Sequence, residues 1–575
     1  MRRIFFLCGA LLSAFFAFLT VGASAQIPPA TDPGEQQLRQ QERELQLRRQ
    51  IESASDVWRR PAETAQVPRL PVDESPCVLI ARIELAGDMA KRFASLLDSV
   101  NDASDGVEDK VTGRCIGSVG IGIAMRRLQN ELMRRGYVTT RVLAAPQALD
   151  AGVLTLTLIP GRVRAIRFAE GTSSRATKWN AAPLQPGELL NLRALEQALE
   201  NFKRVPSADA DIRIEPAVSR DARPGDSDVV LGWRQDFPWR VNLSADNSGL
   251  KSTGRYQGAL TLSLDHALTL NDLFYVSVNR SLFEPSSGPR ATEGNVVHHS
   301  LPFGYWLLGA TASNSEYRQP VASQHGTTVY SGESANRELK LSRVLARSAT
   351  RKTSGYLSAW ARQSDNDIGG MQMRVQHRQT GGWEAGLAHR EILGNATLDL
   401  NAAYRRGTGA FGAARLVNED SEGSTRLQLL QVGALYNLPF VLAGRQVRYT
   451  LALRAQHAWT ALQPQDRFSI GSRFSVRGFD EQRVLSADHG WLIRNDLGFS
   501  LGGSGQEAYI GLDYGAVRGR HSELLAGTQL AGMAIGLRGV ARGIVYDVFA
   551  GRALCGPEGF YDNGLNLGFS LSWSH

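Results

Sequence analysis

The sequence predicts a transmembrane antiparallel β-barrel of about 16 strands, preceded by two small α/β domains and an N-terminal helix. Three observations support this fold class. The chain begins with a targeting segment, and residues 77–236 repeat one order of strand and helix patterns. From about Phe237 onward, segments of about 8–12 residues alternate apolar and polar side chains between turns rich in Gly, Asn, Asp and Ser.

Residues 1–25 have the composition of a signal peptide. Arg2 and Arg3 form a basic start, an apolar run follows as far as Val21, and Ala23-Ser24-Ala25 is a small-residue cleavage site. A membrane-spanning anchor is the alternative, and the cleavage site favours the signal peptide. The mature chain is therefore predicted to leave the cytoplasm.

Residues 26–54 are predicted to form a helix that plugs a pore, with the helical pattern over 31–54. Charged and Gln residues surround this segment and its few apolar residues form no wide stripe, so it is unsuited to an apolar core. At about 1.5 Å per residue, roughly 20 residues reach about 30 Å, which is the thickness of a membrane. A solvated or disordered arm is the alternative.

Residues 55–76 are predicted to be an extended linker, because four Pro residues stand among small and polar residues.

Residues 77–163 and 164–236 then resemble two copies of one α/β module. The expected elements of the two copies are strands Val78–Leu85, Tyr137–Ala144 and Gly152–Ile159 with a helix from about Ile121 to Gly136, and strands Val163–Phe168, Asp211–Glu215 and Asp228–Trp233 with a helix through Leu192 and Phe202. Open edges of such sheets can accept an extended peptide as an added strand. A role as spacers is the alternative.

Cys77 and Cys115 lie in the first module, where an oxidising compartment would allow a disulfide between them. Two separate thiols are the alternative. No His or Cys neighbour stands at ligand spacing, so we expect no metal site. Cys8 leaves with the signal peptide, and Cys555 is assigned no role.

Residues 237–575 are predicted to form the barrel. Val447, Tyr449 and Leu451 point to one side, while Arg448 and Thr450 point to the other. Charges on the second face indicate a wet interior, and roughly 340 residues at about 20 per strand and loop give about 16 strands. Alternation would also fit a soluble sandwich, but the signal peptide and the aromatic terminal segment ending at Trp573 favour a membrane barrel.

A candidate site lies late in the chain. Arg477, followed by Gly478 and Phe479, stands in a segment rich in Gly and Ser that can fold inward. Alternation places Asp513 on the lumen side of a strand, and Gly515 leaves room beside it. An Arg–carboxylate pair can be bidentate, so it could pin the loop to the wall. Two unrelated lumen charges are the alternative.

Composition excludes several functions. The formal net charge of +8 is modest for 575 residues and the Arg residues are scattered, so no nucleic-acid partner is expected. No phosphate-binding Gly-x-x-x-x-Gly-Lys-[Ser/Thr] loop, Gly-x-Ser-x-Gly elbow or His-Glu-x-x-His motif occurs, so we expect neither a cofactor nor an enzyme. A plain porin would not need residues 77–236.

Four motifs together resemble the TpsB transporters of two-partner secretion. They are Arg135-Gly136-Tyr137-Val138-Thr139-Thr140-Arg141, Asn201-Phe202-Lys203-Arg204-Val205-Pro206-Ser207, Asp246-Asn247-Ser248-Gly249 with Thr253-Gly254-Arg255-Tyr256, and Val476-Arg477-Gly478-Phe479 with Asp513. The resemblance covers essentially the whole mature chain. One departure is the C-terminus, where Ser574 and His575 follow the aromatic Trp573 that usually ends such barrels.

The resemblance implies a plug helix, a linker, two POTRA domains in the periplasm and a 16-stranded outer-membrane barrel. Its long sixth extracellular loop carries the Arg motif and folds into the pore onto the Asp. It also implies a large unfolded client with an N-terminal secretion domain, which is a haemolysin, an adhesin or a contact-dependent toxin. Outer-membrane lipid and the barrel assembly machinery are the other implied partners, and a monomer is expected. An insertase of outer-membrane proteins, built from the same parts, is the alternative, which the helix, linker and only two modules disfavour.

Overall fold

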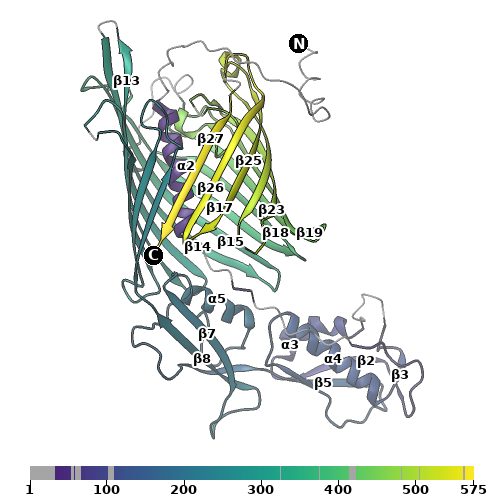
Figure 1. Cartoon of the computed structure of the whole chain (residues 1–575). Helices are drawn as coiled ribbons and strands as arrows, with labels where there is room; N and C mark the ends of the chain where they lie inside the picture. Colours follow the sequence, from purple (N-terminus) through teal and green to yellow (C-terminus); the bar gives the residue numbers. More distant parts are fainter. Residues whose placement is uncertain are drawn as a thin grey trace.

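The computed structural model describes residues 33–52, 57–58, 67–101, 109–285, 287–323, 326–373, 376–413, 423–480, 482–503, 505–560 and 564–575. The predicted signal peptide and parts of the predicted plug and linker segments (26–32, 53–56 and 59–66) lie outside these residues. The described chain forms a barrel with one helix inside it and two α/β domains below one rim (Figure 1). No helix among the described residues is long and apolar enough to cross a membrane.

Sixteen long antiparallel strands of the described chain close into the barrel, which confirms the predicted fold class. They are β9 (Trp239–Asp246), β10 (Gln257–Asp265), β11 (Leu273–Ser281), β12 (Ala291–Phe303), β13 (Trp306–Ser323), β14 (Gly326–Arg347), β15 (Arg351–Ile368), β17 (Arg378–Leu393), β18 (Ala396–Gly407), β19 (Gln428–Leu442), β20 (Arg445–Ala458), β23 (His489–Ser500), β24 (Glu507–Arg518), β25 (Gln529–Ala541), β26 (Ile544–Cys555) and β27 (Asn566–Ser574). The two-residue β16 (Met371–Gln372) only extends the end of β15. β27 pairs with β9 to complete the ring.

Strand β24 shows why the alternating pattern produces a wall with two different faces. Successive side chains point to opposite sides, so Ile510 and Leu512 are each 47% exposed on the outside. Tyr509 and Asp513, which precede and follow this pair along the strand, are 2% and 4% exposed and face the lumen. The outside therefore suits lipid and the inside holds polar groups.

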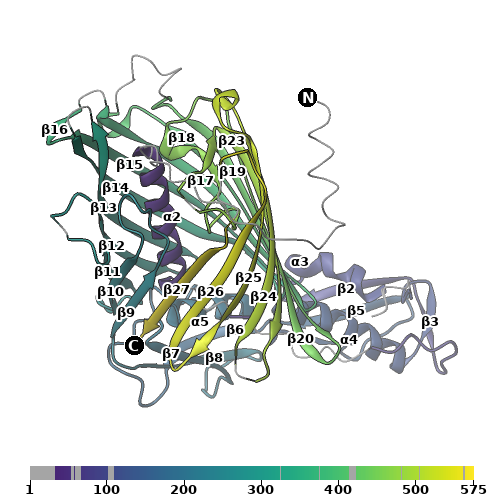
Figure 2. The same ribbon diagram turned by 45° about the horizontal axis from the view of Figure 1, so that its top comes forward.

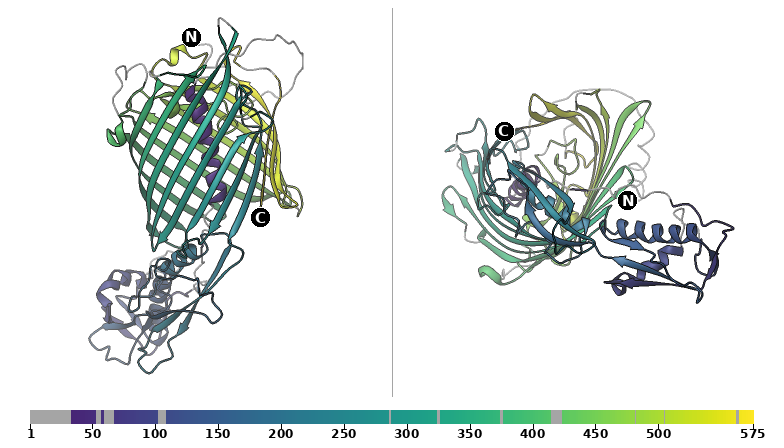
Figure 3. Two further views of the ribbon diagram at one scale, coloured as in Figure 1. Left: turned by 90° about the vertical axis from the view of Figure 1, so that its left-hand side faces the viewer. Right: turned by 90° about the horizontal axis from the view of Figure 1, so that it is seen from below.

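Helix α2 (Pro33–Ile51) lies inside the lumen along the wall, as three views agree (Figures 1, 2 and 3). Its 19 residues reach about 28 Å at about 1.5 Å per residue. Polar side chains hold it there. Arg48 lies 3.2 Å from Glu338 on β14, and Glu52, just beyond the helix, accepts a hydrogen bond from the Tyr275 hydroxyl on β11 at 2.9 Å. A helix with no wide apolar stripe thus finds partners in a polar lumen.

The first α/β domain has its own core. Its elements are β1 (Val78–Ile80), β2 (Arg82–Gly87), α3 (Ala90–Phe93), η2 (Ala94–Asn101), β3 (Arg114–Ile116), α4 (Ser118–Arg134), β4 (Arg141–Leu143) and β5 (Val153–Ile159). The single strand expected over Val78–Leu85 is broken at Ala81, because β1 pairs with β3 in a separate sheet. Sequence patterns also missed α3 and η2, which are too short to show helical periodicity but bury Phe93, Leu96 and Val100.

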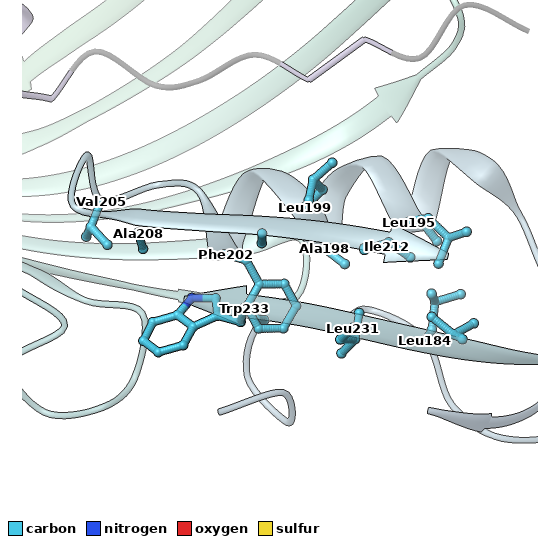
Figure 4. Packing of buried hydrophobic residues seen from close by; sticks show 14 of the residues in the cluster. Leu184, Leu195, Ala198, Leu199, Phe202, Val205, Ala208, Ile212, Leu231 and Trp233 are labelled. Atoms are coloured by element: carbon cyan, nitrogen blue, oxygen red, sulfur yellow. The ribbon is translucent and has the colours of Figure 1, made fainter. Parts of the chain in front are cut away.

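The second α/β domain repeats the sheet topology of the first. Its elements are β6 (Arg162–Phe168), α5 (Leu192–Phe202), β7 (Ala208–Pro216) and β8 (Asp226–Gln235). In both domains the central strand pairs with one parallel and one antiparallel neighbour, in the orders β2-β5-β4 and β6-β8-β7. One face of α5 packs on this sheet through Leu195, Leu199 and Phe202 (Figure 4).

The core of the second domain extends into the barrel. The same apolar cluster contains Leu273 and Tyr275 of β11, Val296 of β12 and Ile51 at the end of α2. Every residue of α5 is buried, which means that the helix is covered on both sides. The second domain is therefore seated against the barrel rim, directly below the lumen (Figure 1).

Candidate functional site

The segment between β20 and β23 folds back into the barrel lumen. Its two short strands, β21 (Phe468–Ile470) and β22 (Leu485–Ala487), pair with each other as a hairpin, and β21 contacts the wall strands β23 and β24. We call residues 459–488 the inner loop. The view along the barrel shows chain within the ring of strands (Figure 3). The sequence predicted this inward course from the Gly and Ser content of the loop.

Arg477 of the inner loop binds Asp513 of β24 through three hydrogen bonds. The Arg477 side chain donates from Nε to Asp513 Oδ2 and from Nη2 to Oδ1, each at 2.7 Å. The Arg477 backbone N–H adds a third bond to Oδ2 at 3.0 Å. The two residues are 3% and 4% exposed. This bidentate, buried ion pair fixes both the backbone and the side chain of the loop at one point of the wall.

The other three predicted site residues surround this pair. Gly478 has a φ of +103°, and a Cβ there would lie 2.4 Å from the backbone of Arg552 on β26. A Cβ at Gly515 would lie 2.9 Å from the loop residue Ile470. Phe479 is 3% exposed and packs edge-on against Phe560, with ring centroids 6.1 Å apart. The structure therefore brings all five residues to one place.

Two further residues that contact Arg477 were not among the site residues predicted from the sequence. Asp496 of β23 accepts a second bond from Arg477 Nη2 at 2.5 Å. Gly532 of β25 stands opposite Asp513, and a Cβ there would lie 1.7 Å from the Arg477 carbonyl oxygen. Alternation along residues 491–501 points Asp496 to the lumen side, so it carries a local signal, whereas Gly532 carries none because one Gly among 58 is not distinctive.

An apolar cluster lies inside the lumen, which differs from the uniformly wet interior that the charges indicated. Phe468, Ile470 and Val476 of the inner loop pack against Leu492 and Leu530 on the inward face of the wall. The lumen is therefore polar where it meets α2 and partly apolar where it meets the loop. A loop that buries apolar side chains can hold a defined position in the resting pore.

A second buried ion pair fixes the base of the loop. Here the loop supplies the carboxylate and the wall supplies the arginine. Asp466, in the one-turn helix η5 (Pro464–Asp466), lies 3.1 Å from Arg362 on β15, and these side chains are 3% and 6% exposed. Helix α2 contacts η5 directly. The plug and the loop are therefore in contact with each other as well as with the wall.

Arg473 joins the loop to the seam where the barrel closes. β27 pairs with β9 over five residues, whereas other neighbouring wall strands that the structure describes pair over eight or more. Beyond this short ladder, the Asn247 side chain donates to Leu567 O and accepts from Phe569 N, both at 2.9 Å. Arg473 Nη2 donates to Asn247 O and Oδ1, each at 2.8 Å. The loop thus adds contacts where the pairing between neighbouring wall strands is shortest.

The predicted disulfide partners lie far from the lumen, in the first α/β domain. Cys77 and Cys115 are bonded, with Cα atoms 5.3 Å apart, and link the start of β1 to β3. The same domain contains the partly buried carboxylate of Asp109, which accepts from the Leu70 N–H at 2.8 Å and from Arg127 Nη2 at 2.5 Å. Burial raises the pKa of Asp109, but the Leu70 N–H and the Arg127 guanidinium outweigh it and hold the pKa below the usual value.

Among the residues that the structure describes, no group of three or more His, Cys, Asp or Glu side chains could hold a metal ion. The lumen site is instead a set of ion pairs and close backbone contacts. Such a set can hold the inner loop and α2 at fixed places in the lumen.

Three family models match the chain. Residues 225–539 match the model described as haemolysin secretion/activation protein ShlB/FhaC/HecB. Residues 162–216 match a POTRA domain, and residues 98–161 match a POTRA domain of ShlB type. The matches place two POTRA domains before the barrel.

Similar proteins cover nearly the whole chain. The outer membrane transporter CdiB-2 of Burkholderia pseudomallei strain 1026b is 35% identical over 97% of this chain and 98% of its own. The hemolysin transporter protein ShlB of Serratia marcescens is 27% identical over 78% of this chain and 77% of its own. The solved structure of CdiB from Acinetobacter baumannii superposes with a TM-score of 0.81 at 31% identity, covering 94% of this chain and 99% of that one.

Proposed function

The chain belongs to the ShlB/FhaC/HecB family of haemolysin secretion/activation proteins, and we propose that it captures one large unfolded client in the periplasm and exports it through its barrel. Membership makes it an outer-membrane transporter of two-partner secretion, with its POTRA domains in the periplasm. The proposal adds the route and the order of events. Its client is a haemolysin, an adhesin or a contact-dependent toxin, and the similarity to CdiB proteins favours the toxin.

The observation that carries the proposal is a polar lumen filled by two elements that both lie in it without being part of its wall. Helix α2 is held by polar side chains such as Arg48. The inner loop is held by the Arg477–Asp513 and Asp466–Arg362 pairs. The polar contacts of α2 can be exchanged for contacts with water at a small net cost, so this helix can leave the pore, whereas release of the inner loop must break buried ion pairs. A vacated lumen of this kind suits an extended polypeptide.

The POTRA domains stand where a client would arrive. The second one is seated against the rim below the lumen, and the first lies to its side (Figure 1). The edge strands β2 and β4 of the first domain each pair with a described strand on one side only, whereas β6 also meets Leu189 through an isolated bridge. An extended client can add to such edges through main-chain hydrogen bonds.

No nucleotide-binding motif was found, so the proposed source of energy is folding of the client outside the cell. Export in this scheme needs no catalytic group, and we propose that the protein is not an enzyme. It works as a monomer after insertion by the barrel assembly machinery. An insertase function is not favoured, because the family model and the relatives describe secretion.

The test is export in the native host. Deleting the gene should abolish release of the large secreted protein encoded beside it, and the wild-type gene should restore release. The levels of abundant porins in the outer membrane should stay unchanged. A fall in porin assembly together with normal client release would contradict secretion and support the insertase alternative.

A further inference from the structure

Two buried ionic side chains form hydrogen bonds with the main chain of one linker residue at the entrance of the barrel. We call this pair of side chains the ionic grip. The Val57 N–H donates to Glu200 Oε1 of α5 at 3.1 Å. Arg347 Nη2, at the end of β14, donates to the Val57 carbonyl oxygen. Both polar groups of a single peptide residue are thus bound by side chains, and neither bond depends on which side chain the linker residue carries.

This grip requires an extended chain. The N–H and C=O of one residue point to the same side in a β-strand, where they pair with one neighbour. Inside a helix the same two groups point along the axis in opposite directions and are already bonded. Glu200 and Arg347 therefore act towards Val57 as a partner strand would, and they select an unfolded segment.

The two gripping side chains are held in place independently of Val57. Arg347 Nη2 lies 2.8 Å from Glu200 Oε1, and Arg347 Nε lies 3.1 Å from Glu196 Oε2. Lys352 of β15 lies 2.8 Å from Glu200 Oε2. The Arg347 and Glu200 side chains are 2% and 9% exposed. Because the charges compensate each other, the site persists when the linker leaves.

An apolar surface lies next to the ionic grip. Val57 packs against the cluster shared by the second POTRA domain and the barrel, as do Leu47 and Ile51 of α2. The Trp58 ring lies over the Arg347 guanidinium, 5.5 Å from its carbon to the ring centroid. When α2 and Val57 withdraw, the apolar surface and the two ionic side chains become accessible together.

We propose that this junction, formed by Glu200, Arg347 and the adjoining apolar cluster, is a binding site for an extended segment of an unfolded polypeptide. Val57 of the linker occupies it at rest, and a segment of the exported client replaces Val57 when α2 leaves. The site lies between the POTRA domains and the lumen (Figure 1), so it hands the client from one to the other. This inference rests on the proposed function for the identity of the occupant.

The experiment measures binding rather than export. A fluorescent peptide of residues 52–60 is titrated in detergent against the full chain and against a variant lacking residues 26–60. The peptide should bind the shortened protein and not the intact one, because the intact protein fills the site with its own linker. Reduced and carboxymethylated α-lactalbumin, an unrelated unfolded chain, should compete, whereas native α-lactalbumin should not.

Two changes test the contacts themselves. Methylating the Val57 nitrogen of the peptide removes one hydrogen bond without altering the protein, and it should weaken binding by about tenfold. Arg347→Ala in the shortened protein should abolish binding, while Arg351→Ala, an exposed neighbour, should leave it unchanged. Heat-modifiable migration on gels shows that each variant is folded.

Absence of peptide binding to the shortened protein, or equal binding of the N-methylated peptide, overturns the site. Either result can be obtained while the client is exported normally. The proposed function would then stand without this site. Undiminished client release in the gene-deletion test would contradict the proposed function without bearing on the peptide titration, so the two failures are distinguishable.

Discussion

At the scale of single residues, the site depends on backbone proximity as much as on charge. Arg477 meets two carboxylates, Asp513 and Asp496, and its own N–H and carbonyl both contact the wall region around β24 and β25. This is possible only because Gly532 has no side chain. The contact therefore requires both the ion pair and the absence of a side chain at Gly532.

The first prediction concerns the ion pair. Arg477→Ala and Asp513→Ala should both insert into the membrane and reduce export by at least about tenfold, because breaking a buried pair costs about 3–5 kcal/mol and a wet lumen reduces that cost. Arg477→Ala should be the more severe, since Asp513→Ala leaves Arg477 bound to Asp496. Quantified secreted client is the measurement, with exposed Arg518→Ala as the control.

The double variant completes this cycle. If the two residues act through one contact, its defect should be close to that of Arg477→Ala alone rather than the product of the two single defects. Heat-modifiable migration checks folding of each protein. Strictly multiplicative defects would show that the residues act separately, and normal export by Arg477→Ala would remove the pair from the mechanism.

The second prediction concerns Gly532. In Gly532→Ala, a methyl group would lie 1.7 Å from the Arg477 carbonyl oxygen, so the loop must move although both charges remain. Export should fall to a level like that of Arg477→Ala. Gly309→Ala in β13 is the matched control, because its nearest neighbour would be an ordinary contact 3.6 Å away. Equal export by the two Gly variants would show that the close approach has no role.

At the scale of elements, the first POTRA domain is the part of the chain with its own closed core. Residues from Val67 to Leu158 form one apolar cluster without barrel residues. The second POTRA domain shares its cluster with β11, β12 and α2. The first domain is therefore expected to fold as an isolated fragment, and two predictions concern a fragment of residues 67–161.

The third prediction concerns the disulfide. Cys77 and Cys115 are 38 residues apart, and closing a loop of this length stabilises a domain by about 3–4 kcal/mol in the chain-entropy model. Replacing both by Ala should lower the unfolding free energy of the fragment by about that amount. Urea denaturation followed by circular dichroism measures it. An unchanged midpoint would mean that the bond contributes nothing to the folded domain.

The fourth prediction concerns the acid stability of the same fragment. Asp109 has a lowered folded pKa, so it releases its proton more readily when folded than when unfolded. The contribution of this carboxylate to the unfolding free energy is complete above its unfolded pKa of about 3.8. It is lost as the pH falls through the lower folded pKa. The unfolding free energy of the fragment should therefore be constant near neutral pH and should fall below about pH 4.

Asp109→Asn tests this assignment. It should flatten the acid limb of the melting temperature against pH, whereas exposed Asp150→Asn should leave the limb in place. The comparison is made by thermal melting between pH 3 and pH 7, at constant ionic strength. An identical acid limb in the wild type and Asp109→Asn would assign the pH dependence to other carboxylates.

At the scale of the whole molecule, three parts meet at one rim. Helix α2 ends where the second POTRA domain begins to cover the lumen, and Ile51 belongs to the core of that domain. The same helix contacts η5 at the base of the inner loop. A change at the periplasmic side can thus reach the loop through α2, which gives the resting pore a physical connection between entrance and interior.

The fifth prediction concerns the plug. Deleting residues 26–54 should raise the ion conductance of the purified protein in planar bilayers severalfold, because α2 fills part of a polar lumen. Arg49→Gln, on an exposed part of the helix, should leave conductance near the wild-type value. Unchanged conductance after the deletion would mean that the inner loop alone closes the pore.

The sequence by itself determined the kinds of structure present and several of their residues. Period-two alternation predicts a two-faced wall whatever the strands pair with, because it follows from backbone geometry. The same rule placed Asp513 on the lumen side. A helix with no wide apolar stripe predicted a polar environment for α2. The motif around Arg477 and the inward reach of its loop were also recognisable locally.

Only the tertiary structure decided which distant groups meet. The Gly532–Arg477 approach, the Arg362–Asp466 pair and the contacts of Arg347 and Glu200 with Val57 join residues up to 290 positions apart, and no local pattern marks them. The break at Ala81 and the apolar cluster inside the lumen have the same origin. Pairing register and loop placement set the neighbours of a side chain, and neighbours, not residue types, determine these contacts.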